Sequence, residues 1–199
     1  MTGTIEILDT TLRDGEQTSG VSFNDEEKLT LAKILLEDLG VNRIEVASAR
    51  VSQGELSAFR KICAWAETAG RLEQVEALGF VDGGQSIRWI SESGGRVLNL
   101  LAKGSLKHVT TQLGKTPEQH WNDILRDVAM AHAAGLGVNI YLEDWSNGMK
   151  DNRDYVFQLV DALSTRTSVR RFMLPDTLGV LDPLSAVRHL HHLRKRYPH

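Results

Sequence analysis

A dense run of polar side chains follows the first apolar stretch of the chain. Arg13, Asp14, Glu16 and Gln17 lie within five positions of one another, shortly after residues 5–8. A carboxylate is a hard oxygen ligand for a divalent cation, and a guanidinium stabilises negative charge that develops on a carbonyl oxygen. An ordinary turn at Asp14-Gly15 has the same composition, so the spacing alone leaves a catalytic loop and a plain turn as alternatives.

Two further polar clusters end apolar stretches later in the chain. Tyr141 and Glu143 alternate along one of them, so on a strand they project from the same face. Thr177 follows another, where its hydroxyl and nearby backbone N–H groups suit a carboxylate. Each cluster also fits a strand-to-loop junction, with Asp144 as a cap and Trp145 as a packed anchor.

Six short stretches rich in β-branched residues are expected to be the strands that carry these side chains. They are residues 5–8, 43–46, 75–79, 97–101, 138–142 and 171–174. A helical pattern follows each of them. The clearest helix starts are Asn24 with Glu27 three residues later, and Thr116 before Pro117.

The alternation of strands and helices predicts an α/β fold with a parallel sheet. Six β-α units suit either an open doubly wound sheet or most of a (β/α)8 barrel, whose usual length is about 250 residues. Nearly every strand ends in a reactive or charged side chain, whereas an open sheet needs this only at its switch point. The polar strand ends therefore favour the barrel.

The composition indicates a soluble globular protein without nucleic acid or membrane partners. The chain has 199 residues, 41% hydrophobic and 25% charged, and 23 Lys and Arg against 26 Asp and Glu give a net charge of −3. No apolar stretch approaches the roughly 20 residues of a membrane-spanning helix. The lone Cys63 and the absence of a leader-like start predict a cytoplasmic setting.

Residues 8–17, Leu-Asp-Thr-Thr-Leu-Arg-Asp-Gly-Glu-Gln, resemble the opening signature of the DRE-TIM metallolyases. That family includes isopropylmalate, homocitrate and citramalate synthases and HMG-CoA lyase. Further segments most resemble its (R)-citramalate synthases: residues 43–52, 78–82, 97–101, 141–148 and 174–180. The resemblance extends over essentially the whole chain.

The resemblance implies a (β/α)8 TIM barrel and an acyltransferase that condenses acetyl-CoA with pyruvate to (R)-citramalate. Claisen-type condensation and thioester hydrolysis would serve isoleucine biosynthesis. By position, Asp14 would be a metal ligand, Arg13 would polarise the pyruvate keto group, and Gln17 would lie beside it. Thr177 would hold the pyruvate carboxylate, and Glu143 would help to activate the acetyl-CoA methyl group.

The resemblance also assigns the pocket wall around the pyruvate methyl group to Leu78, Leu101 and Tyr141. Such a wall disfavours longer 2-oxoacids, since one methylene is worth roughly 1–3 kcal/mol of discrimination. The metal is Mg, Mn, Zn or Co on ligand chemistry alone. The family further implies a homodimer and a C-terminal regulatory domain.

The histidines do not complete the metal site that the family implies. Its synthases carry a His-x-His pair on a later strand, so residues 1–199 are expected to be an incomplete catalytic barrel domain, about six units long, without the regulatory domain. His189 and His191 match the His-x-His pattern, but they fall within the apolar helical pattern of residues 184, 187, 190 and 193. Two positions apart on a helix, their side chains point about 200° away from each other. His108 and His120 are expected at the surface.

Two other functions stay open beside the citramalate reaction. One is an isopropylmalate- or homocitrate-type synthase, or a related lyase, on the same barrel. The other is an inactive fragment or assembly partner. If the missing histidines are essential, these 199 residues alone make no citramalate.

Overall fold

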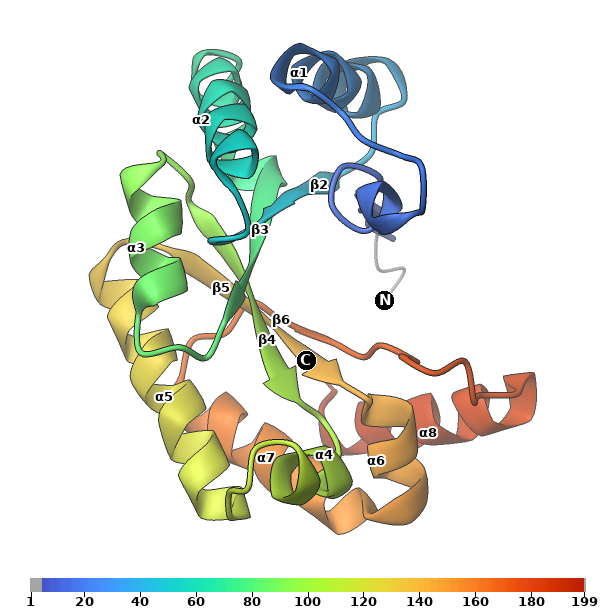
Figure 1. Ribbon diagram of the computed structural model, residues 1–199. Helices are drawn as coiled ribbons and strands as arrows, with labels where there is room; N and C mark the ends of the chain where they lie inside the picture. Colours follow the sequence, from blue (N-terminus) through green and yellow to red (C-terminus); the bar gives the residue numbers. More distant parts are fainter. Residues whose placement is uncertain (1–4, 199) are drawn as a thin grey trace.

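The computed structural model describes residues 5–198 and contains one six-stranded sheet (Figure 1). Its strands pair in the order of the sequence, β1 to β6, and each neighbouring pair is parallel. They are β1 (Leu8–Asp9), β2 (Arg43–Ser48), β3 (Val75–Phe80), β4 (Val97–Lys103), β5 (Gly137–Glu143) and β6 (Arg171–Met173).

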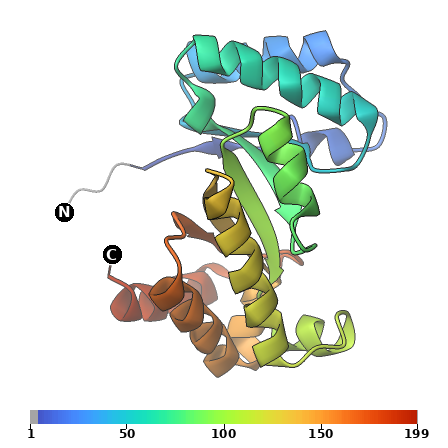
Figure 2. The same ribbon diagram turned by 90° about the vertical axis from the view of Figure 1, so that its left-hand side faces the viewer.

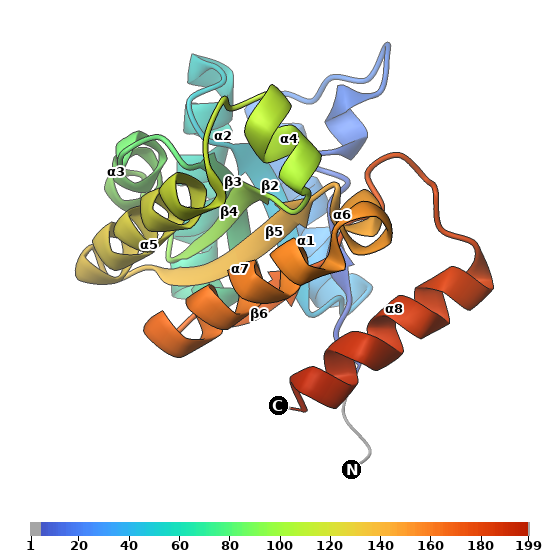
Figure 3. The same cartoon turned by 90° about the horizontal axis from the view of Figure 1, so that it is seen from below.

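Helices connect the strands and cover the outer face of the sheet, where Figure 3 shows α3, α5 and α7 side by side. The α-helices are α1 (Asp25–Lys33), α2 (Gln53–Thr68), α3 (Gln85–Glu92), α4 (Leu106–Thr111), α5 (Pro117–Ala133), α6 (Trp145–Asp151), α7 (Arg153–Arg166) and α8 (Pro183–Arg196). Three short turns complete the set: η1 (Gly15–Gln17), η2 (Ile34–Asp38) and η3 (Leu72–Gln74). None of the helices in residues 5–198 combines the length and apolar character needed to cross a membrane.

The two clearest helix starts have the side-chain bonds that their residue types predict. Asn24 accepts from the N–H groups of Glu26 and Glu27, and the Glu27 carboxylate accepts from Asn24 N. Thr116 makes the same reciprocal exchange with Gln119 at the start of α5. These capping boxes satisfy N–H groups that the first helical turn leaves without partners.

The sequential strand order excludes the doubly wound alternative, which requires the order to reverse at a switch point. The sheet is curled. Asn99 on β4 donates to Glu45 on β2 across 2.6 Å although β3 lies between them, and such a contact requires a concave face. Along β5, Val138, Ile140 and Leu142 are fully buried toward the helices, so the alternating residues face the concave interior.

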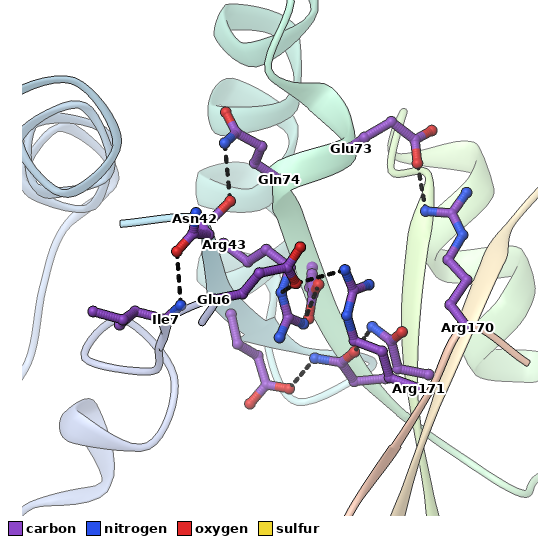
Figure 4. Close-up of polar contacts among 12 residues, drawn as sticks. Glu6, Ile7, Asn42, Arg43, Glu73, Gln74, Arg170 and Arg171 are labelled. Carbon is purple, nitrogen blue, oxygen red and sulfur yellow. Dashed lines mark hydrogen bonds and ion pairs between the residues drawn. The ribbon is translucent and has the colours of Figure 1, made fainter. Parts of the chain in front are cut away.

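A cluster of ion pairs joins the segment before β1 to the last strand at the amino end of the sheet (Figure 4). Glu6 Oε2 lies 2.7 Å from Arg171 Nη2 and 3.4 Å from Arg43 Nε. Arg43 Nη1 also lies 2.9 Å from the buried Glu76 carboxylate. This cluster links the segment before β1 to β2, β3 and β6 and supports the curl.

One expectation about the first strand is wrong in detail, and the helix after the last strand leaves most of its apolar stripe uncovered. The first strand begins at Leu8, and Ile5 and Ile7 are exposed. In α8, only Leu193 of the expected apolar stripe is buried, whereas Leu184, Val187 and Leu190 are exposed. Figure 3 shows α8 set apart from the sheet, beyond α7. The apolar spacing predicted each element but not whether a surface covers it.

Candidate active site

The polar run after β1 forms a tight turn that carries Arg13 at the carboxyl end of the sheet. The carbonyl of Thr10 accepts three N–H groups, from Arg13, Asp14 and Gly15, at 2.8–3.1 Å. Leu12 is fully buried and anchors the turn to the core. The structure thus combines the two alternatives, because the residues form a turn and the turn positions a guanidinium.

A buried lysine fixes this turn to the rest of the fold. Lys28 on α1 is 2% exposed and donates to the carbonyl of Leu12 at 3.2 Å. Its ammonium also pairs with Glu16 at 2.6 Å and with Glu55 on α2. Burial acts to raise the pKa of Glu16, but the bond and charge of Lys28 and the bond from Phe23 N together lower it. Glu16 is therefore structural rather than free to bind a ligand.

The Arg13 guanidinium is held between two carboxylates. Its Nε donates to Glu45 Oε1 at 2.6 Å, and its Nη1 donates to Asp14 Oδ1 at 2.7 Å. Glu45 is fully buried, and burial raises its pKa even though Arg13 acts in the opposite direction. Burial also acts to lower the pKa of Arg13, but Glu45 and Asp14 raise it overall. Arg13 is thus a fixed cation with a defined orientation.

Below Arg13, a hydrogen-bonded chain crosses the interior of the curled sheet. Asn99 Nδ2 donates to Glu45 Oε2 at 2.6 Å, and Asn139 Nδ2 donates to Asn99 Oδ1 at 2.8 Å. All three side chains are fully buried. Sequence reasoning missed all three as site residues, although single polar residues inside otherwise apolar strands were the signal that could have found them.

The proposed wall residues fall into two rows of the interior face. Strand register places Phe80, Leu101, Tyr141 and Met173 opposite one another, so Leu101 and Tyr141 are direct neighbours. Leu78 lies one row deeper, opposite Asn99. Burial and the nearby Glu45 carboxylate raise the pKa of Tyr141, so its phenol is neutral at physiological pH. Phe80 and Met173 are additional members of the upper row.

Glu143 lies one row nearer the mouth and is paired with a lysine. Lys103 is its register partner on β4, and the two side chains form a close ion pair. Leu101, Lys103 and Glu143 line a common pocket of about 290 Å³. His120 lines it too, with Nε2 3.1 Å from the Lys103 carbonyl. The expectation of a surface position for His120 is wrong, since it is 2% exposed and burial lowers its pKa.

Thr177 links the end of β6 to the end of β5. Its Oγ1 accepts from the backbone N of Asp144 at 2.9 Å, which leaves its hydroxyl proton free for a ligand. Asp144 adopts the left-handed region at φ 63° and is buried, with Asn147 Nδ2 at 2.7 Å and His108 Nε2 at 3.4 Å. Trp145 is buried as an anchor of α6, as expected.

Glu45, Asn99 and Asn139 lie within their strands. Arg13, Gln17, Glu143 and Thr177 lie at one end of the sheet, because the strands are parallel and each of these residues is at or beyond a strand's carboxyl end. They line different hollows: Arg13 and Gln17 belong to a pocket of about 350 Å³, separate from the pocket with Leu101 and Glu143. Asp14 is mostly exposed, at 61%. The roles assigned to these side chains stay predictions.

The described residues do not by themselves supply a metal site. Among residues 5–198, the His, Cys, Asp and Glu side chains form no group of three that could hold a metal ion. One oxygen of Asp14 already accepts from Arg13. His189 packs edge-on against Trp145 with ring centroids 6.0 Å apart, whereas His191 is exposed, so the two diverge around α8.

The sequence model of the HMGL-like family matches residues 4–199. The chain is 33% identical over 195 residues to a protein of Methanopyrus kandleri named putative (R)-citramalate synthase. The alignment covers 96% of this chain and 36% of that protein. It is also 33% identical over 180 residues to a 2-isopropylmalate synthase of Saccharolobus solfataricus, which covers 90% of this chain and 44% of that protein. The chain therefore spans less than half the length of these relatives.

Solved structures with low sequence identity share the fold. The HMG-CoA lyase of Bacillus subtilis matches with a TM-score of 0.75 at 22% identity, over 98% of this chain and 65% of that one. A hydroxymethylglutaryl-CoA lyase of Pseudomonas aeruginosa matches with a TM-score of 0.73 at 16% identity, also over 98% of this chain and 65% of that one. The expected fold is confirmed: the curled sheet is a partial (β/α)8 TIM barrel.

Proposed function

The chain belongs to the HMGL-like family, and from that premise we propose that it carries the 2-oxoacid site of a synthase that condenses acetyl-CoA with pyruvate to (R)-citramalate. The observation that supports this most is the Arg13 guanidinium, fixed by Glu45 and Asp14 at the carboxyl end of the strands. A preorganised cation placed there suits a carbonyl oxygen that gains negative charge.

The chemistry divides among the residues at the mouth of the sheet. The Glu143 carboxylate takes a proton from the methyl group of acetyl-CoA, and the resulting enolate carbon bonds to C2 of pyruvate. The keto oxygen becomes an alkoxide stabilised by Arg13 and then takes up a proton. Water cleaves the thioester and releases CoA. The Thr177 hydroxyl donates to the pyruvate carboxylate. Lys103, which pairs with Glu143 in the free protein, must move aside for the first step.

The upper interior row supports pyruvate as the 2-oxoacid. Leu101 and Tyr141 are direct neighbours, with Phe80 and Met173 on either side. Large side chains in a single row leave little room beyond a methyl group. Discrimination against a longer 2-oxoacid would then exceed the roughly 1–3 kcal/mol that one methylene supplies, because steric exclusion adds to it.

A divalent ion at Asp14 would polarise the pyruvate carbonyl together with Arg13. The donor set within residues 5–198 does not fit such an ion, because Asp14 is not joined there by two further ligands.

Binding of two 2-oxoacids tests the proposal directly. Isothermal titration calorimetry with pyruvate and with 2-oxoisovalerate should show tighter binding of pyruvate, by about tenfold or more. Arg13→Gln should abolish that binding. Arg50→Gln is the matched control: Arg50 also follows a strand at this end of the sheet and pairs with Asp82 at 3.1 Å.

Each other result has a defined meaning. Tighter binding of 2-oxoisovalerate would favour the isopropylmalate-type reaction, whose named relative is as similar in sequence as the citramalate relative. Equal losses in Arg13→Gln and Arg50→Gln would show that general charge, not the fixed guanidinium, binds the ligand. Failure of both ligands to bind would refute a 2-oxoacid site in these residues.

Three further elements of the proposal rest on the resemblance. They are a homodimer, an end-product regulatory domain elsewhere in the protein, and a cytoplasmic role in isoleucine synthesis. Cys63 is compatible with a reducing setting, because it is a buried free thiol whose pKa burial raises to about 12. Light scattering of the purified protein tests the homodimer.

A further inference from the structure

A second cavity lies behind the loop that follows β6, away from Arg13. It has a volume of about 370 Å³ and lies between α6, the start of α7, residues 180–182 and the first turns of α8. Figure 1 shows α6 beside the amino-terminal half of α8. None of the residues assigned to the 2-oxoacid chemistry lines this cavity.

The lining of the cavity carries more positive than negative charge. Lys150, Arg153 and Arg188 line it, and within residues 5–198 none of them lies within ion-pair distance of a carboxylate. Asp182 is the one acid in the lining, and it accepts from Ser185 N at 2.9 Å and from Ser185 Oγ at 2.6 Å as the cap of α8. Three cations and one carboxylate leave a formal charge of +2.

Buried polar atoms without hydrogen-bond partners cluster at the same place. Among the described residues, Ser146 Oγ and His189 Nδ1 are buried and unpartnered, and both residues line the cavity. Trp145 Nε1, beside them on α6, is a third such atom. Ser146 lies beside the Asp176 carboxylate and lowers the pKa of that carboxyl. A buried donor without an acceptor costs about 1–3 kcal/mol, so a ligand with several acceptor oxygens would stabilise this region.

The arginines lie close to His189. Burial lowers the pKa of His189, and the cations of Arg153 and Arg188 lower it further. Arg153 Nη1 also lies 3.4 Å from His192 Nδ1. Lys150, Arg153 and Arg188 are exposed to solvent and line the same cavity.

We propose that this cavity binds a phosphate group, either as inorganic phosphate or as part of a small phosphorylated molecule. A phosphate monoester carries a charge of about −1.5 to −2 at neutral pH, which matches the +2 of the lining. Its oxygens accept from arginine in pairs, as carboxylates do, and it offers more acceptors than a carboxylate. The volume falls within the range of about 300–1,000 Å³ that small-molecule sites occupy. This site does not depend on the 2-oxoacid chemistry proposed above.

Calorimetric titration with two probes at constant ionic strength in chloride tests the site. Inorganic phosphate and 3′,5′-ADP are titrated into the protein and into the double variant Arg153→Gln/Arg188→Gln. The matched control is Arg166→Gln/Arg194→Gln, which removes two arginines from the same two helices; these also have no carboxylate partner among the described residues. Circular dichroism verifies that both variants are folded.

Saturable binding of either probe, weakened about tenfold or more in the first variant and unchanged in the control, would support the site. Tighter binding of 3′,5′-ADP would identify a nucleotide-borne phosphate, and equal binding a free phosphate group. The proposal is overturned if neither probe saturates the protein, if the first variant binds as the parent does, or if both variants weaken equally.

Discussion

Glu45→Gln tests whether the buried carboxylate under Arg13 is what makes the guanidinium a binding group. Glu45 accepts from Arg13 Nε and from Asn99 Nδ2, each at 2.6 Å, through different oxygens. Glutamine offers one oxygen and one NH2 group. Whichever way the amide turns, one of the two donors loses its acceptor and faces another donor.

The structure sets the size of the effect on stability. Breaking a buried ion pair costs about 3–5 kcal/mol when the remaining charge has no other partner. Here Arg13 keeps Asp14 at 2.7 Å, and glutamine avoids the desolvation that raises the pKa of Glu45. The expected loss in the free energy of unfolding is therefore about 1–3 kcal/mol, the cost of one unsatisfied buried donor. Pyruvate binding should fall by about tenfold or more, because the guanidinium loses its orientation.

The pH dependence follows from the sign of the shift. Because the folded-state pKa of Glu45 is raised, the protein is most stable with this carboxyl protonated, and that stability is lost as the pH rises through the folded pKa. Glutamine stays neutral throughout. The difference in unfolding free energy between parent and variant should therefore narrow as the pH rises from about 4, the ordinary value for glutamate.

Glu76→Gln is the matched control for Glu45→Gln. Glu76 is equally buried and pairs with Arg43 at 2.9 Å, but at the amino end of the sheet. Urea unfolding should show comparable losses for the two variants, while calorimetry with pyruvate should show a loss only for Glu45→Gln. If Glu76→Gln weakens pyruvate binding as strongly, or if Glu45→Gln binds pyruvate like the parent, the reasoning about Arg13 fails.

Three other predictions concern packing, α8 and turnover. Gly148→Ala should lower unfolding free energy by about 1–3 kcal/mol in urea, because its Cβ would lie 2.3 Å from the Gly104 carbonyl; an unchanged midpoint would contradict this packing. The ion pair with Arg196 holds the pKa of Asp161 below its usual range. This contact between α8 and α7 is therefore present while the pH stays above the ordinary pKa of aspartate. It is lost as the pH falls through the lowered pKa of Asp161. Limited proteolysis should then cut Asp161→Asn faster than the parent at pH 7 but equally fast in acid, and equal rates at pH 7 would count against this. A polypeptide of residues 1–199 with pyruvate, acetyl-CoA and manganese should release no CoA, since residues 5–198 gather no three metal-capable side chains; steady release would point first to His189 and His191.

The order of the elements could be predicted from the sequence because the spacing of apolar residues within each strand and helix indicates which face is buried. The alternation in β5 and the capping residues Asn24 and Thr116 are local patterns. Such patterns can be recognised without knowing which elements pack against them. The stripe of α8 was also a correct local pattern. Its exposure depends on which surface lies opposite, and no spacing within one helix contains that information.

The site was less accessible to sequence reasoning for a related reason. Arg13, Tyr141 and Glu143 were predicted as site residues because their side chains are reactive and they lie near strand ends, and their roles stay predictions. Asn99 and Asn139 are ordinary amides, and their role depends on a contact between strands that are not neighbours in the sheet. The barrel prediction implied a curved sheet, but it did not say which interior side chains of β2 and β4 would meet across it.

The curvature of the sheet and the geometry of the site depend on the same polar contacts of the interior face. Glu45 reaches Asn99 past β3, and Glu6 reaches Arg171 from the other end of the sheet, so both polar contacts exist only while the sheet is curled. A flat sheet would keep the pair of Glu45 with Arg13 but would take Asn99 away from the buried Glu45, at about 1–3 kcal/mol for an unsatisfied buried group. The same contacts that hold the strands in a partial barrel therefore hold Arg13 in one orientation. A substitution that flattens the sheet should weaken ligand binding even when it touches no ligand.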